Sequence, residues 1–498
     1  MKLWQKGFET NKEIEKFTVG KDRQMDLMLA EFDVLGSLAH IKMLENINLL
    51  TEEELEILTK ELLLILEDIK SGNFTIEDDV EDVHSQVELL LTRKLGDIGK
   101  KIHSGRSRND QVLVDLKLFI RSKIKEVVQK TKTLFDTLIE LSEKYKEIDM
   151  PGYTHYQVAM PSTFGLWLGS YAESLVDDLT VMNSAWKVTN KNPLGSAAGY
   201  GSNFPLNRSM TTNLLGFDTL NYNSIYAQMG RGKTERIVAF ALSQIGMTLS
   251  KLSQDICLFS NQNYGFLKLP DELTTGSSIM PHKKNPDVFE LVRAKMNKLN
   301  SLPNEITSII SNLSSGYHRD MQIIKESFMP SFDDILDCLE IVNYSLKQIE
   351  VKKDILSDPR YQHIHSVEEV NNLVLSGLSF RDAYRKVGED IQNGTYQRNT
   401  EDVKYTHQGS IGNLCNDDII REMYFVITSF RFNEVDKSIT KLYGGYSIPI
   451  YEDGVKTDFT VDGIIGDDKY LELMELGNGI ELPHKINVGT KKKQKYEF

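Results

Sequence analysis

The hydrophobic pattern of the chain predicts helices over most of its length, from residue 26 to about residue 390. Thr51 and Glu54 have the residue types and the spacing of a capping box, which begins a helix when an apolar run follows. The apolar positions after them are three or four residues apart: Leu55, Leu58, Leu62, Leu66 and Ile69. Residues 72–80 do not continue this pattern, so we expect the helix to end before them.

One of the expected helices is very long, because no glycine or proline occurs between Gly105 and Pro151. Apolar residues recur there at spacings of mostly three or four, at Val112, Leu116, Phe119, Ile124, Val127, Leu134, Leu138 and Leu141. About 40 helical residues span about 60 Å, which is typical of an extended helix bundle. Further helices of this bundle are expected at about 161–190, 230–262 and 286–315, the last with a kink at Pro303.

The pattern divides the chain into three domains. Glycine-rich turns close an N-terminal helical domain of residues 1–105, and the long helices form a central bundle of residues 106–355. A C-terminal helical domain of residues 356–498 becomes β-like from about residue 400, and Ser447–Val461 alternates around Asp453-Gly454 as in a β-hairpin. The expected fold class is mainly α, with a small β-like C-terminal extension.

Composition narrows the possible partners. The chain has 498 residues, of which 40% are hydrophobic, and this is enough for large buried cores. Its net charge of -14 disfavours nucleic acid and anionic membranes as partners, so an acidic ligand must meet a local positive site. The three cysteines are far apart and suggest neither disulfides nor a metal site. With no apolar signal segment and no run long enough to span a bilayer, we expect a cytoplasmic protein.

An eleven-residue loop, Gly276–Pro286, stands out because it has neither helical nor strand periodicity. Its sequence, GSSIMPHKKNP, combines two hydroxyls, two lysines and an asparagine. Pro286 suits the first position of a helix, and helix N-termini favour carboxylate or phosphate ligands. We interpret the segment as a mobile anion-binding loop, although a short piece of it also fits an ordinary polar loop.

Three more polar clusters lie at ends of expected helices, at residues 103–111, 152–157 and 317–325. In the first cluster, Arg108 suits bidentate contacts with a carboxylate and Asn109 is a neutral donor, at a helix start that favours anions. The other reading of this cluster is a helix cap with surface charges.

The second and third clusters each allow two readings. His155 follows a helix break and is either an acid–base group near neutral pH or a partner of a loop carbonyl. Tyr317, Gln322 and Lys325 belong either to a binding site or to a polar loop between helices.

The spacing of Asp82, His84 and Glu88 resembles that of a metal site. Because no further ligands accompany them, a solvated helix face fits better, and we expect no metal.

The length of the central helix has a consequence for the site. The first polar cluster lies at its start and His155 just beyond its end, so one chain cannot easily bring both to one small ligand. If they cooperate, different subunits must contribute them, as in a symmetric oligomer of antiparallel bundles.

Together the four clusters resemble the argininosuccinate lyase branch of the fumarase/aspartase superfamily, over residues 20 to 390. The loop GSSIMPHKKNPD is similar to one that the whole superfamily shares. HSGRSRNDQ, GYTHYQ and the stretch from Tyr317 to Lys325 resemble argininosuccinate lyases more than fumarases or adenylosuccinate lyases. The resemblance implies a three-domain fumarase/aspartase-like fold and a homotetramer whose sites are shared between subunits.

The resemblance also implies a reaction: argininosuccinate is cleaved reversibly to arginine and fumarate through a carbanion, without metal or organic cofactor. The catalytic residues it implies are Ser277 as base, His155 as acid, Lys283 and Glu290. The substrate-binding residues it implies are Arg108, Asn109, Thr154, Asn285, Tyr317, Gln322 and Lys325. Whether Ser277 and His155 exchange roles is left open.

Several positions depart from the family's pattern. His282 stands where glutamine is more common, Phe17–Asp26 lacks an evident substrate serine, and the acidic pattern of residues 230–235 is altered. Two alternatives therefore accompany the main reading. One is an adenylosuccinate lyase-like enzyme, which would need nucleotide contacts that the sequence does not suggest. The other is a non-catalytic relative such as an eye-lens crystallin, against which the intact Ser277 and His155 argue.

Overall fold

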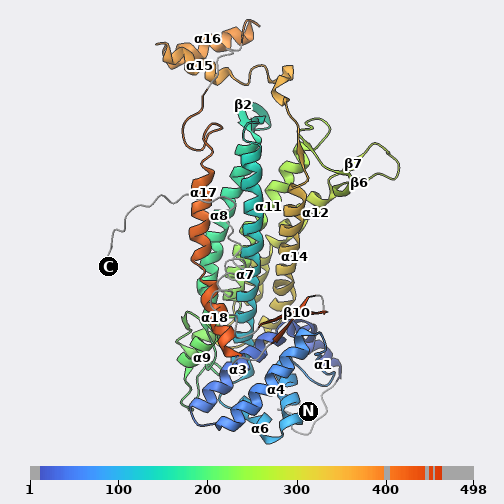
Figure 1. Ribbon diagram of the computed structural model, residues 1–498, viewed down its shortest axis with the longest axis vertical. Helices are drawn as coiled ribbons and strands as arrows, with labels where there is room; N and C mark the ends of the chain where they lie inside the picture. The colour runs from blue at the N-terminus through green and yellow to red at the C-terminus, as the bar shows by residue number, and fades with distance from the viewer. Residues whose placement is uncertain (1–11, 398–403, 444–447, 453–454, 462–498) are drawn as a thin grey trace.

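The computed structural model describes residues 12–397, 404–443, 448–452 and 455–461. A bundle of long helices sets its long axis, and the N-terminal helices gather at one end, as Figure 1 shows. The expected mainly helical fold class is confirmed. None of the described helices combines the length and the apolar content needed to cross a membrane.

The N-terminal end of the molecule is built from short and medium helices. Their bounds are α1 Lys12–Val19, α2 Asp22–Leu27, α3 Ala30–Asn46, α4 Glu52–Lys70, α5 Val83–Leu95 and α6 Asp97–Lys100. α4 begins at the expected capping box, because Thr51 Oγ1 accepts from Glu54 N at 3.2 Å and Glu54 Oε2 accepts from Thr51 N at 3.1 Å. Its apolar face packs on α3, and Leu38, Leu58 and Leu62 are fully buried in their shared core.

The central part consists of long, roughly aligned helices with short ones between them. Their bounds are α7 Arg108–Lys144, α8 Phe164–Thr189, α9 Arg208–Leu214, α10 Ser224–Met229, α11 Lys233–Phe259, α12 Asp287–Leu299, α13 Leu302–Ile310 and α14 Ile324–Leu346. The 37 residues of α7 span about 55 Å, close to the expected length.

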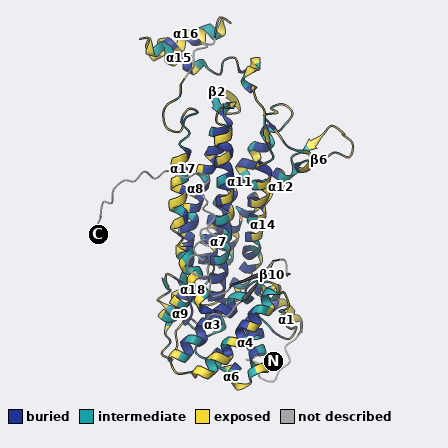
Figure 2. Ribbon diagram, in the orientation of Figure 1, coloured by how far each residue is buried: buried dark blue, intermediate teal, exposed yellow. Residues whose placement is uncertain are grey.

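The bundle holds together through one continuous apolar core shared by α7, α8, α11, α12 and α14. Phe119, Phe135, Trp186 and Phe328 are among its fully buried side chains, and each stabilises the fold by roughly 1.5–3 kcal/mol on leaving water. Figure 2 shows the buried faces of the long helices turned toward one another.

Two sequence expectations for the helices need correction. The single kinked helix expected at 286–315 is two helices, α12 and α13, because the chain breaks at residues 300–301 and Pro303 lies in the first turn of α13. The β-like character expected from about residue 400 does not include residues 416–442, which form two helices. The bounds of the C-terminal helices are α15 Ser366–Leu375, α16 Phe380–Gln392, α17 Asn416–Thr428 and α18 Phe432–Leu442.

The described strands form five two-stranded pairs. Their bounds are β1 Asp149–Thr154, β2 Gln157–Thr163, β3 Lys191–Asn192, β4 Thr219–Leu220, β5 Leu267–Lys268, β6 Thr275–Gly276, β7 Lys284–Asn285, β8 Glu350–Val351, β9 Ile448–Glu452 and β10 Val455–Val461. The pairs are β1–β2, β3–β4, β5–β8, β6–β7 and β9–β10, of which only β3–β4 is parallel. β9 and β10 pair on either side of residues 453–454, as the expected hairpin requires.

Candidate active site

A polar cavity of about 240 Å³, termed here the α7 cavity, lies at the beginning of α7. Its walls come from α2 and α7, from the first turns of α5 and α14, and from the segments before α5, α11 and α14. They consist of Asp22, Asp26, Glu81, Asp82, His84, Arg108, Asn109, Val112, Arg231, Tyr317, Arg319, Gln322 and Lys325. The cavity thus brings together the predicted substrate-binding residues of two clusters that are far apart in the sequence, 103–111 and 317–325.

The first turn of α7 is fixed in place by a buried carboxylate. Asp110 Oδ1 accepts from Ser107 N at 2.8 Å, which closes a capping box. Asp110 Oδ2 accepts from Gly195 N and Ala197 N, both at 2.9 Å. The helix start is therefore anchored to a second loop, and this holds Arg108 and Asn109 at the cavity wall.

Ion pairs line one side of the α7 cavity. Arg108 Nη1 lies 3.2 Å from Asp82 Oδ2 and 3.5 Å from Glu81 Oε2, and Arg319 Nη2 lies 3.1 Å from Glu81 Oε1. Burial alone would raise the pKa of Asp82, but the charges of His84 and Arg108 and hydrogen bonds from the helix start lower it. The cavity therefore offers both carboxylates and guanidinium groups to a ligand of mixed charge.

The N-terminal segment also contacts residues of the cavity wall. Lys325 is 3% exposed. Its Nζ lies 2.7 Å from Asp26 Oδ1 and also forms an ion pair with Asp22. Gln322 Nε2 donates to the carbonyl oxygen of Thr18 at 3.0 Å. Two predicted substrate-binding residues thus already have partners within the chain, and a bound substrate would compete for them.

His84 is not on a solvated helix face, so that expectation is wrong. It is buried, with Nδ1 2.8 Å from Asp33 Oδ1 and 3.4 Å from Asp115 Oδ2. Burial would lower the pKa of His84, but the hydrogen bond and charge of Asp33 and the charge of Asp115 raise it to about 10.

Asp33, His84 and Asp115 are also close enough for a cation, with ligand atoms within 4.8 Å of one another. Burial and the neighbouring charge of Asp33 hold the pKa of Asp115 well above its ordinary value, and the protonated imidazole and the buried guanidinium of Arg106 offset the negative charge of the two carboxyl groups. The donor set therefore suits a network of internal ion pairs better than a divalent metal.

His155 lies at the opposite end of α7 from the α7 cavity, at the turn between β1 and β2. Thr154 pairs with Gln157, and the two turn residues, His155 and Tyr156, have φ values of 53° and 59°. Hairpin turns of this kind favour asparagine and glycine, so a histidine and a tyrosine here are strained. The turn exposes Thr154 and His155, and His155 also lines a cavity of about 470 Å³ against Trp167 and Asp255.

The Gly276–Pro286 loop projects from the bundle beside α12, as the labels β6 and β7 in Figure 1 show. Gly276 pairs with Lys284 and Thr275 with Asn285, so the two ends of the loop are joined by a short antiparallel β-ladder. Ser277 Oγ accepts from Met280 N at 3.1 Å. This amide would favour negative charge on the serine oxygen. Pro286 lies one position before α12, at its N-cap, rather than at its first residue.

The predicted site residues therefore fall into three places within one chain. Arg108, Asn109, Tyr317, Gln322 and Lys325 lie at the α7 cavity. Residues 154–155 lie beyond the other end of α7, about 55 Å away along the helix. Residues 277–285 lie on the projecting loop and Glu290 on α12. Among the described residues, His155 and Glu290 make no hydrogen bond or ion pair with each other.

The sequence interpretation missed several residues of the α7 cavity. Asp22 and Asp26 lie in the stretch where no substrate serine was evident, and Arg231 lies in the segment whose acidic pattern is altered. Arg231 and Tyr317 face each other, with the guanidinium carbon 5.9 Å from the ring centre. The departures from the family's sequence pattern at residues 17–26 and 230–235 were the signal in the sequence that points to these positions.

Comparison with known sequences gives relatives that cover most of the chain. Residues 7–299 match the model of a family described as lyase. A protein from Bacteroides fragilis named argininosuccinate lyase is 62% identical over 443 residues, which cover 89% of this chain and 99% of the relative. A protein of the same name from Thermotoga neapolitana is 40% identical over 388 residues, 78% of this chain and 98% of the relative.

Solved structures share the fold at low sequence identity. An EDDS lyase in complex with formate superposes with a TM-score of 0.70 at 20% identity, over 86% of this chain and 96% of that one. A class II fumarase from Schistosoma mansoni superposes with a TM-score of 0.65 at 14% identity, over 87% and 95% of the two chains. The helical bundle is therefore common to enzymes with different substrates.

Proposed function

The chain belongs to the lyase family and to its argininosuccinate lyases, and from this premise we propose which of its residues carry the reaction. It is a carbon–nitrogen lyase that cleaves argininosuccinate reversibly to arginine and fumarate, the last step of arginine biosynthesis. The observation that carries this function is the 62% identity over 99% of a relative of that name. The adenylosuccinate lyase alternative is not favoured.

We propose that Ser277 removes the proton next to the substrate carboxylate. A free serine is a weak base, so it needs neighbours that stabilise its alkoxide. The Met280 amide nitrogen lies 3.1 Å from Ser277 Oγ and favours the alkoxide, and Lys283 of the same loop would add its positive charge. The resulting carbanion spreads its charge into the carboxylate, which Lys283 and Asn285 would hold.

His155 would donate a proton to the guanidinium nitrogen that leaves. Its strained, exposed turn supports this role, because residues held in disfavoured backbone conformations cluster at functional sites. Thr154 would bind substrate beside it. Glu290 would orient the imidazole, and since the two make no contact within the chain, we propose that this pair forms between subunits.

The α7 cavity would bind the part of the substrate that does not react. Argininosuccinate carries carboxylates, an amino group and a guanidinium group, and the cavity wall carries charges of both signs. Arg108, Asn109, Tyr317 and Gln322 would bind its carboxylate or polar groups. Lys325 would join them by exchanging part of its pairing with Asp22 and Asp26 for a substrate carboxylate.

The active enzyme would be a homotetramer in which each site draws residues from several subunits. The separation of about 55 Å between the two ends of α7 supports this, because one small substrate cannot reach both. The bundle also carries large apolar side chains on its outer surface: Phe240 is 52% exposed, Met247 55% and Leu291 64%. A second subunit packed there would cover them.

We also propose a cytoplasmic location, which the three free thiols of Cys257, Cys338 and Cys415 support.

The experiment that tests the function follows fumarate by its absorbance with argininosuccinate as substrate. Release of fumarate from argininosuccinate but not from adenylosuccinate is the expected result. Release from adenylosuccinate alone would favour the other lyase, and release from neither would favour a non-catalytic relative.

A further inference from the structure

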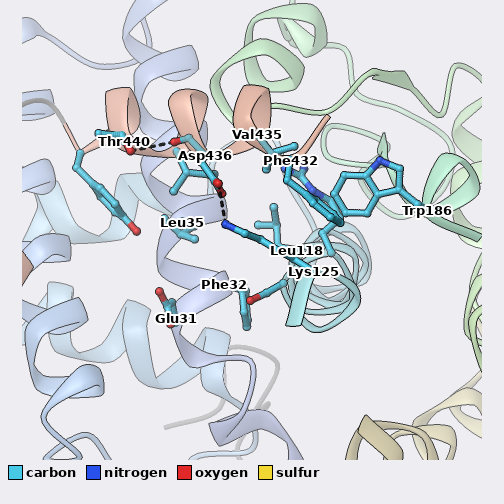
Figure 3. A pocket seen from close by; sticks show the side chains of 14 residues that line it. Glu31, Phe32, Leu35, Leu118, Lys125, Trp186, Phe432, Val435, Asp436 and Thr440 are labelled. Carbon is cyan, nitrogen blue, oxygen red and sulfur yellow. Dashed lines mark hydrogen bonds and ion pairs between the residues drawn. The ribbon is translucent and has the colours of Figure 1, made fainter. Parts of the chain in front are cut away.

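A second cavity, termed here the α18 cavity, lies between α3, α7 and α18 and has a volume of about 330 Å³ (Figure 3). It shares no lining residue with the α7 cavity. On α7 the nearest lining residue to Asn109 is Leu118, nine positions further along. Neither the proposed mechanism nor the proposed substrate contacts use this cavity.

Much of the wall is apolar and aromatic. Phe32 and Leu35 come from α3, Trp186 from the end of α8, and Phe432 and Val435 from α18. The rings of Trp186 and Phe432 meet edge to face with centres 4.9 Å apart. A flat apolar group could pack against this surface.

The charged residues of the wall are paired, with one exception. Lys125 Nζ lies 2.7 Å from Asp436 Oδ2, as the dashed line in Figure 3 shows, and Glu31 pairs with Lys70 at 3.1 Å. Arg121, one turn before Lys125 on α7, has no ion pair within the part of the chain that the structure describes.

Arg121 is nevertheless almost fully buried, with 3% of its surface exposed. Its Nη1 donates to the carbonyl oxygen of Leu215 at 3.0 Å, and its guanidinium carbon lies 4.3 Å from the centre of the Phe217 ring. Its Nε has no hydrogen-bond partner. Burial lowers the pKa of Arg121 to about 9, so it still carries its charge near neutral pH. The charges of Asp218 and Asp436 attract the guanidinium, but neither carboxylate forms an ion pair with it, so an anion brought by a ligand would give this buried cation a direct partner.

We propose that the α18 cavity binds a small organic carboxylate with an apolar body. The carboxylate pairs with Arg121, and the body packs on Trp186 and Phe432. The cavity volume is at the lower end for small-molecule sites, so the ligand has the size of one substituted ring or a short branched chain. Because the walls come from four helices, the bound ligand ties α18 to α3, α7 and α8.

The test uses benzoate as the probe and benzamide as its uncharged match, with binding followed by calorimetry and by the thermal unfolding temperature. Benzoate is expected to bind saturably and raise the unfolding temperature, whereas benzamide at the same concentration leaves it unchanged. Arg121→Gln should weaken benzoate binding at least about tenfold. Arg108→Gln, in the α7 cavity, should not.

A second variant covers the case in which Arg121→Gln fails to fold. Val435→Phe keeps every charge but fills the cavity, and it should also abolish benzoate binding. The proposal is overturned if benzoate shows no saturable binding, if benzamide binds equally well, or if Val435→Phe binds benzoate normally. Loss of binding in Arg108→Gln would place the probe in the α7 cavity and overturn it too.

Discussion

Mixing two inactive variants tests whether each active site is assembled from different subunits. His155→Ala removes the proposed acid at one end of α7, and Ser277→Ala removes the proposed base on the projecting loop. Each variant alone is expected to be inactive. In a hybrid, a site that takes its β1–β2 turn from one subunit and its loop from another can receive both intact residues.

The expected recovery follows from the geometry and from random assembly. His155 lies at the β1–β2 turn and Ser277 on the separate β6–β7 loop, and within the described chain His155 makes no hydrogen bond or ion pair with that loop, so the site is proposed to take the two from different subunits. In an equal mixture, half of the subunits carry an intact His155 and half an intact loop. If a site draws the two independently, about a quarter of the sites are complete, and activity should recover to about a quarter of the wild-type value.

The assay follows fumarate after subunit exchange, with hybrid formation verified by native mass spectrometry of differently tagged subunits. A matched control mixes Ser277→Ala with Lys283→Ala. Both changes lie in one loop, so every loop in these hybrids carries a defect and no recovery is expected. Verified hybrids of the first pair with no more activity than the unmixed variants would refute the shared site.

Three further outcomes are expected. Ser277→Ala should lower kcat by about three orders of magnitude or more without changing the elution volume of the protein, whereas Ser278→Ala in the same loop should retain most activity. Phe240→Glu places a charge on a 52% exposed apolar position and should dissociate the assembly, seen by light scattering, with loss of activity. The pKa of His84 is about 10 in the folded state, compared with an ordinary value of 6.5. Protonated His84 therefore stabilises the fold fully below pH 6.5, and this stabilisation is lost as the pH rises through 10. Asp33→Asn should therefore lower the free energy of urea unfolding at pH 7 by at most about 4 kcal/mol, and by less at pH 10.5; an equal loss at both would contradict the charge assignment.

The long helices could be predicted from the sequence, but the partners of its charged residues could not. α7 was evident because no glycine or proline interrupts its periodic pattern. α17 was overlooked because glycines precede it, although its buried positions Ile419, Met423 and Ile427 have helical spacing. His84 was misread because its partner Asp33 lies 51 residues earlier, and no local pattern connects the two.

The same distinction applies to the candidate site. Sequence motifs indicated Arg108 and Asn109 but not the carboxylates of Asp22 and Asp26, since these two residues come from a separate helix and meet the cavity only through folding. The Pro303 break illustrates a further limit. A proline in a helical pattern is compatible either with a kink or with the first turn of a new helix, and the surrounding packing decides between them.

The proposed assembly links catalysis to association in a way that a single chain does not allow. Within the described residues of one chain, His155 is exposed at its turn, and Ser277 Oγ on the projecting loop accepts hydrogen bonds only from backbone amides of that loop. A carbanion is protonated quickly by water, so the reaction needs a closed site. If neighbouring subunits supply the missing walls of the site, assembly both excludes water from it and brings the catalytic groups together. Specific activity should then fall on dilution in parallel with the fraction of tetramer measured by light scattering, and full activity of dissociated subunits would contradict this dependence.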